Sequence, residues 1–235
     1  GLGYYAIIAA LDNKWITATA MITISVLMDG LDGRIARATK TTSEFGLNFD
    51  SLVDAISFGV APAVIIYYYW INELQLNDYR LFAIILTFIY IATGAMRLAR
   101  FNVLTKSNLP NTYFIGLPIP AAAGLVSTAV WVYEKYPYLK GNPDVSVIFK
   151  RLLPAVVLIV SYLMISKVRY YSFKQAKNLV KRPIIFLIAI TLMLYLLLRF
   201  PSITLFCIGI IYVSSGPVRA LFSISKIIEK KNEMV

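Results

Sequence analysis

The chain has 235 residues, 59% of them hydrophobic, and a mean hydropathy of +0.70. Soluble domains contain roughly 45–50% apolar residues, so this composition excludes an ordinary soluble fold and indicates an integral membrane protein. The 23 Lys and Arg residues outnumber the 12 Asp and Glu residues, which gives a net charge of +11. Because the basic residues lie in short loops beside apolar segments, they favour contact with anionic lipid headgroups over binding to nucleic acid.

Apolar runs of about twenty residues, the length that crosses a bilayer as a helix, recur along the chain. We expect an all-α integral membrane protein with seven full spans, at about Trp15–Ala36, Leu47–Trp70, Tyr79–Leu98, Phe114–Glu134, Ile148–Ser166, Pro183–Arg199 and Ser202–Phe222. The apolar segment Gly1–Leu11 is too short to cross. It predicts part of a first helix whose beginning is missing, which makes about eight spans in all.

Eight spans place both termini on the same side of the membrane. On that side, the loops at 34–40, 97–106, 167–182 and the tail from 219 onward carry sixteen of the 23 Lys and Arg residues. Cytoplasmic loops are enriched in Lys and Arg, so this side is predicted to be cytoplasmic.

Four acidic residues, all between positions 29 and 54, fall inside or at the edge of these spans: Asp29, Asp32, Asp50 and Asp54. A charge at membrane depth costs about 2.5–3.5 kcal/mol, so four carboxylates together need a compensating charge or a wet cavity. The residues of each pair lie three or four positions apart and share a helix face. A short loop at 39–45 makes the two helices antiparallel neighbours, so the four carboxylates should converge near the cytoplasmic face.

A divalent cation would offset the repulsion within this cluster. The chain has no histidine and its single thiol, Cys207, is remote, which argues against zinc or copper. All-oxygen ligation suits Mg²⁺ or Mn²⁺, and Ca²⁺ could occupy the same site. A cation transporter is the alternative from another class, although the acids of an ion pathway tend to be spread across the membrane depth.

Small residues interleave with the acids at Gly30, Gly33, Ala36 and Gly46. They leave open backbone beside the carboxylates, where a bulky ligand could approach, although small residues also serve tight helix packing in membranes. Arg37 offers a bidentate fork suited to a phosphate oxygen, and its alternative role is to extend toward lipid headgroups.

The acidic segment reads Asp29-x-x-Asp32-Gly33-x-x-Ala36-Arg37, then eight residues, then Gly46-x-x-x-Asp50-x-x-x-Asp54. Every defined position and both gap lengths resemble the signature of the CDP-alcohol phosphatidyltransferase family. The resemblance implies that an alcohol attacks the lipid-side phosphorus of a CDP-activated lipid and that CMP leaves. It implies that all four aspartates line the metal site and that Asp54 is the base that deprotonates the acceptor hydroxyl. It also implies contacts to cytidine and phosphates from Gly33, Ala36, Arg37 and Gly46.

The stretch from Asp50 to Pro62 resembles the phosphatidylserine synthase branch of this family, as do stretches at 97–102, 116–121 and 164–174. The resemblance implies L-serine as acceptor, with phosphatidylserine and CMP as products. Arg97 and Arg100, one helical turn apart, could bind the serine carboxylate, with Asn102 nearby; their alternative role is a positive-inside anchor. The alternative is the same reaction with another acceptor, an inositol phosphate or glycerol phosphate.

The resemblance covers most of the chain and implies one membrane-embedded catalytic domain over residues 1–235. Residues 1–134 would carry the transferase core and residues 148–222 additional membrane helices. We expect a multi-pass protein of the cell membrane, active in phospholipid biosynthesis, with its active site on the cytoplasmic side. The expected partners are a CDP-activated lipid with diacyl or ether-linked tails, L-serine and membrane lipids, and no nucleic acid. Helix-rich membrane enzymes often pair, so a homodimer is a further expectation.

Overall fold

The computed structural model describes residues 1–39, 44–74, 77–106, 113–171 and 183–232; of these, residues 33–39, 73, 77, 104–106, 113–114, 171, 183–186 and 221–232 are described as backbone alone. Helices make up nearly all of the regular structure, as expected for an all-α membrane protein. They are α1 (Leu2–Leu11), α2 (Trp15–Thr39), α3 (Glu44–Asp54), η1 (Ala55–Val60), α4 (Ala61–Tyr68), η2 (Tyr69–Glu73), η3 (Asn77–Tyr79), α5 (Arg80–Lys106), α6 (Ile119–Lys135), α7 (Pro137–Gly141), α8 (Pro143–Ile165), α9 (Pro183–Arg199) and α10 (Pro201–Asn232).

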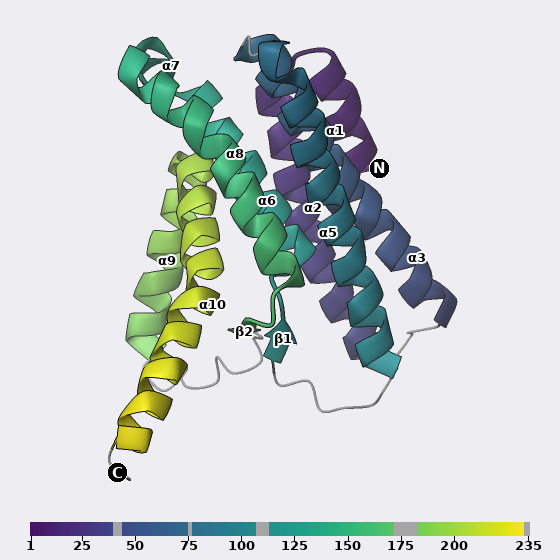
Figure 1. Cartoon of the computed structure of the whole chain (residues 1–235), viewed down its shortest axis with the longest axis vertical. Helices are drawn as coiled ribbons and strands as arrows, with labels where there is room; N and C mark the ends of the chain where they lie inside the picture. Colours follow the sequence, from purple (N-terminus) through teal and green to yellow (C-terminus); the bar gives the residue numbers. More distant parts are fainter. Residues whose placement is uncertain (40–43, 75–76, 107–112, 172–182, 233–235) are drawn as a thin grey trace.

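The helices form an elongated bundle in which the chain runs repeatedly from one end to the other (Figure 1). Helix α6 packs against both α2 and α10, while α5 packs against α8 and α1 against α2 and α4. Helix α9 lies at the outer edge beside α10 (Figure 1). The last turns of α2 and α5 and the first turn of α3 lie at the same end of the bundle (Figure 1).

Four helical segments of the described chain are long and apolar enough to cross a membrane: Glu44–Asn72, Arg80–Val103, Pro143–Ile165 and Pro201–Ala220. Each overlaps a predicted span, and the other three predicted spans overlap α2, α6 and α9. Large apolar side chains are exposed along these helices, including Leu198 of α9, which is 85% exposed. An apolar outer surface on helices of this length is the arrangement of a multi-pass membrane protein.

Several threonine and serine hydroxyls in the interior donate hydrogen bonds to backbone carbonyls one turn earlier in their own helices. Thr19 donates to the Trp15 carbonyl and Thr23 to the Thr19 carbonyl, both at 2.8 Å. Thr128 and Ser161 make the same kind of bond on α6 and α8. These bonds satisfy polar groups without breaking the helix, so small polar residues are tolerated among apolar ones.

A short strand replaces the beginning of one predicted span. The expected helix from Phe114 begins only at Ile119, because Tyr113–Ile115 forms strand β1, antiparallel to β2 (Arg169–Tyr171), with Ile115 opposite Arg169. Gly116 follows β1 with a φ of +82°, and a side chain there would collide with the Met164 carbonyl. Since this conformation favours glycine and Pro118 then holds extended backbone before α6, the helix cannot start earlier.

Candidate metal centre and substrate site

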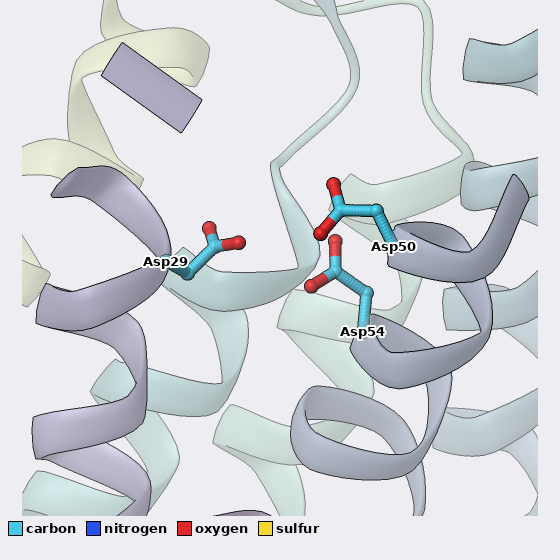
Figure 2. A group of neighbouring side chains, drawn as sticks. All are labelled: Asp29, Asp50 and Asp54. Atoms are coloured by element: carbon cyan, nitrogen blue, oxygen red, sulfur yellow. The ribbon is translucent and has the colours of Figure 1, made fainter. Parts of the chain in front are cut away.

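Three of the four predicted aspartates converge between α2 and α3. Asp29 projects from α2 toward Asp50 and Asp54, which lie one turn apart on α3 (Figure 2). A carboxylate oxygen from each lies within 4.8 Å of the other two. Asp29 and Asp54 are partly buried and Asp50 is exposed, so the cluster lies at a boundary between the bundle and its surroundings.

A local widening of the helix begins directly after Asp54. Residues Ala55–Val60 form a π-helical turn, η1, before α4 resumes. Pro62 has no N–H to donate to the Phe58 carbonyl, and the buried Tyr90 hydroxyl of α5 donates to that carbonyl instead, at 3.0 Å. Such insertions are frequent at functional sites, and here the altered register begins at the aspartate that is predicted to act as base.

Asp32, the fourth predicted ligand, lies one turn beyond Asp29 and is exposed. It does not belong to the group of three converging carboxylates, although its charge lies close enough to Asp50 to repel it. Its role as a metal ligand therefore stays a prediction.

The converging carboxylates fit a hard divalent cation. Three negative charges this close repel one another, and partial burial of Asp29 and Asp54 weakens the screening by water. Their donors are all oxygen, which is the ligand set of Mg²⁺, Mn²⁺ and Ca²⁺. Beside them, a Cβ built on Gly30 would meet nothing within 4 Å. The site thus has both the charge for a metal and open space next to it for a ligand.

Arg97 brings a buried positive charge to the same site. Its side chain, on α5, is 9% exposed and its guanidinium lies 5.2 Å from the centre of the Phe101 ring. The guanidinium is near enough to Asp54 and Asp29 to interact with both electrostatically. A buried arginine beside carboxylates is suited to hold a second anion, such as a phosphate or the carboxylate of a substrate.

The other two residues predicted to bind an acceptor serve contacts within the protein. Arg100 donates to the carbonyls of Ile165 and Ser166 at the end of α8, both at 3.5 Å. Asn102 and Ser51 hydrogen-bond to each other, with the Asn102 Nδ2 atom 2.9 Å from the Ser51 hydroxyl. Because Ser51 follows Asp50, this bond ties the end of α5 to the helix that carries two of the aspartates.

The residues predicted to contact the cytidine and phosphates lie on both sides of the aspartates. Gly33, Ala36 and Arg37 belong to the last turns of α2, where their side chains lie outside the described residues. Gly46 is exposed in the first turn of α3.

Helix α10 reaches the site from the far end of the sequence, which the sequence pattern did not reveal. The Tyr212 hydroxyl is near enough to Arg97 to interact with it. Tyr170 of β2 packs its ring 5.6 Å from that of Tyr212 and donates to the Val213 carbonyl at 3.1 Å. Burial raises the pKa of Tyr170 to about 12, so this donor keeps its proton. Gly216 makes room, because a side chain there would collide with the Tyr170 ring.

Comparison with known proteins gives a consistent picture. The family model for CDP-alcohol phosphatidyltransferase matches residues 2–153. A CDP-diacylglycerol–serine O-phosphatidyltransferase of Helicobacter pylori is 39% identical over 232 residues, which cover 99% of this chain and 91% of that protein. An archaetidylserine synthase of Methanothermobacter thermautotrophicus is 38% identical over 171 residues, covering 72% and 64% of the two chains. A CDP-diacylglycerol–serine O-phosphatidyltransferase of Methanocaldococcus jannaschii is 44% identical over 107 residues, covering 46% and 47%.

Proposed function

The chain belongs to the CDP-alcohol phosphatidyltransferase family, and we propose that it transfers the phosphatidyl group of a CDP-activated lipid to L-serine. The products are phosphatidylserine and CMP, which makes the protein an enzyme of phospholipid biosynthesis. The observation that carries this proposal is the convergence of Asp29, Asp50 and Asp54 within a membrane protein that is 39% identical to a serine transferase over nearly its whole length.

The reaction needs one bond formed and one broken at a single phosphorus atom. The serine hydroxyl oxygen attacks the lipid-side phosphorus, and the bond from that phosphorus to the oxygen of CMP breaks. Asp54, which is partly buried and directly precedes the π-helical turn, accepts the proton of the serine hydroxyl. Asp50, one turn away, and Asp29, opposite both, would hold the divalent cation, and we place Asp32 in its coordination as well.

A bound Mg²⁺ or Mn²⁺ would neutralise the pyrophosphate and the negative charge that develops on the departing CMP. Around it, Gly33, Ala36, Arg37 and Gly46 would contact the cytidine and phosphates, and the open space beside Gly30 supports an approach from this side. The lipid tails, diacyl or ether-linked, would lie against the apolar outer surface of the helices.

For the acceptor, we assign the serine carboxylate to Arg97. This guanidinium is buried and adjacent to Asp54, so a carboxylate bound there would bring the serine hydroxyl to the base. Arg100 and Asn102 act less directly, because Arg100 donates to carbonyls at the end of α8 and Asn102 hydrogen-bonds to Ser51. They would shape the acceptor pocket by fixing the helices around it.

We also propose the arrangement in the membrane. The alternation of helices between the two ends of the bundle supports eight spans, with residues 1–134 carrying the transferase core and residues 148–222 adding helices to one domain. The end with the aspartates adjoins the loops rich in Lys and Arg, which supports a cytoplasmic active site in the cell membrane. A homodimer stays a prediction.

Competition between acceptors tests the choice of serine. Purified protein in detergent, given CDP-diacylglycerol and Mg²⁺ or Mn²⁺, is expected to release CMP and form phosphatidylserine in equal amounts when L-serine is added. Glycerol phosphate and an inositol phosphate should support little release, because a single buried arginine matches one carboxylate better than a dianionic phosphate. CMP release without phosphatidylserine, or faster release with either phosphate, would contradict the assignment of serine.

An Arg97→Gln variant separates acceptor binding from the chemistry in the same assay. It is expected to raise the KM for L-serine by about tenfold or more, since a charge-assisted hydrogen bond contributes about 1.5–3 kcal/mol. The KM for CDP-diacylglycerol should change much less. Arg199→Gln, which removes an exposed arginine from the far end of the bundle, is the matched control. A raised KM for the lipid with an unchanged KM for serine would move Arg97 to the lipid side of the site.

A further inference from the structure

A cavity of about 340 Å³ lies at the end of the bundle that carries α7, opposite the aspartates (Figure 1). The proposed reaction makes no use of it. Its volume is within the range of ligand-binding pockets, roughly 300–1,000 Å³. It lies between η2, η3, α5 and α8 and is lined by Trp70, Tyr79, Phe82, Val147, Lys150 and Arg151.

Three segments that are long enough to span a membrane each begin or end beside the cavity. The segment Glu44–Asn72 ends two residues after Trp70, Arg80–Val103 begins beside Tyr79, and Pro143–Ile165 begins shortly before Val147. Tyr79, Phe82 and Val147 are each exposed on one side, so the cavity opens outward, and aromatic side chains at this level are typical of the membrane–water interface. A ligand in the cavity would therefore be in contact with the edge of the bilayer.

Two positive charges line this mostly apolar cavity. Lys150 is partly buried and Arg151 is exposed, both in the first half of α8. Neither forms a salt bridge with any acidic side chain in the described part of the chain, whereas Lys14 and Lys140 on the same side are paired with Asp12 and Glu134. Cations inside a membrane-spanning segment are costly, and an anionic headgroup would offset that cost.

Two aromatic rings line the cavity next to these charges. The Trp70 side chain is 4% exposed and packs edge-on against Phe82, with ring centres 5.5 Å apart. Together with Tyr79 and Val147, these rings give the cavity apolar walls against which acyl chains can pack.

We propose that this cavity binds an anionic glycerophospholipid of the membrane leaflet opposite the active site. The phosphate would lie between Lys150 and Arg151, and the acyl chains would leave along Phe82 and Val147. An anionic headgroup fits better than a zwitterionic one, because the described residues that line the cavity include two cations and no carboxylate for a choline or ethanolamine group. Free phosphate would leave the apolar walls unused.

Native mass spectrometry of the delipidated full-length chain tests this, with phosphatidylglycerol, phosphatidylcholine and inorganic phosphate as three separate probes. Phosphatidylglycerol is expected to bind about tenfold more tightly than phosphatidylcholine, and phosphate alone should not bind measurably. The double variant Lys150→Gln and Arg151→Gln should lose about tenfold in affinity for phosphatidylglycerol.

Two further variants keep the result decisive. Arg199→Gln removes a positive charge from the same end of the bundle, on α9, whose main packing partner is α10, and should bind phosphatidylglycerol as the unaltered chain does. Lys150→Arg with Arg151→Lys should also retain binding. Unchanged affinity in the Lys150→Gln and Arg151→Gln variant, an equal loss in the distant variant, or displacement of the lipid by phosphate would each overturn the proposal. Serine-dependent CMP release in detergent should stay normal in all of them, so failure here is distinguishable from failure of the transferase assignment.

Discussion

Replacing Asp54 with asparagine is expected to lower the rate of serine-dependent CMP release by about 10²–10⁴-fold, the usual contribution of a general base. Asparagine keeps the shape of the side chain and one oxygen for a metal, but it cannot accept the hydroxyl proton. The fall should be in kcat rather than in the KM for either substrate, because the lost interaction develops only in the transition state. Steady-state release of CMP at saturating serine and CDP-diacylglycerol measures it.

Asp12→Asn is the matched control for this variant. Asp12 is an exposed aspartate that directly follows α1 and pairs with Lys14. It is not part of the aspartate cluster, so its substitution should leave kcat near the unaltered value. A kcat for Asp54→Asn within threefold of the unaltered enzyme would show that another group takes the proton.

Removing divalent cations is expected to lower CMP release by about 10³-fold or more, because a metal contributes several kcal/mol to stabilisation of the transition state. Chelation with EDTA followed by dialysis prepares the metal-free enzyme. Adding Mg²⁺ or Mn²⁺ should restore activity, since both are hard cations that take all-oxygen ligands, as the carboxylates of Asp29 and Asp50 and the phosphates of the substrate would provide.

The Asp29→Asn and Asp50→Asn variants sharpen that experiment. Each removes one negative charge from the cluster, so each should need a higher concentration of Mg²⁺ for half-maximal activity than the unaltered chain. Full activity in the presence of excess EDTA, with no response to added cations, would contradict a metal-dependent reaction at this site.

Much of the site could be predicted from the sequence because its residues are close together in the chain. Asp29, Asp50 and Asp54 lie within 26 residues, on two helices joined by a short loop, and carboxylates at membrane depth are rare enough to stand out. These three carboxylates converge as the argument from spacing and the short loop predicts, whereas Asp32 is not part of the group. The helices were equally predictable, since every expected range overlaps a helix, and four of the described helical segments are long and apolar enough to cross a membrane.

The remaining features depend on contacts between distant parts of the chain. Tyr212 lies more than a hundred residues after Arg97, and only the packing of α10 against α6 and β2 brings them together. The pairing of β1 with β2 was missed because Tyr113–Ile115 continues an apolar run, and hydropathy does not distinguish a short strand from the first turn of a helix. The π-helical turn after Asp54 likewise follows from Pro62 and the distant Tyr90, and no periodic pattern reveals it.

Direct binding of Mn²⁺, measured by electron paramagnetic resonance on the purified chain, tests the central claim that the aspartates of α2 and α3 form one metal site. Free Mn²⁺ gives a strong signal that weakens on binding, so titration yields both affinity and stoichiometry. The unaltered protein should bind Mn²⁺, Mg²⁺ should displace it, and a double variant with Asp29→Asn and Asp50→Asn should lose that binding while Asp12→Asn keeps it. Undiminished, Mg²⁺-sensitive binding in the double variant would contradict the assignment of the metal to these carboxylates.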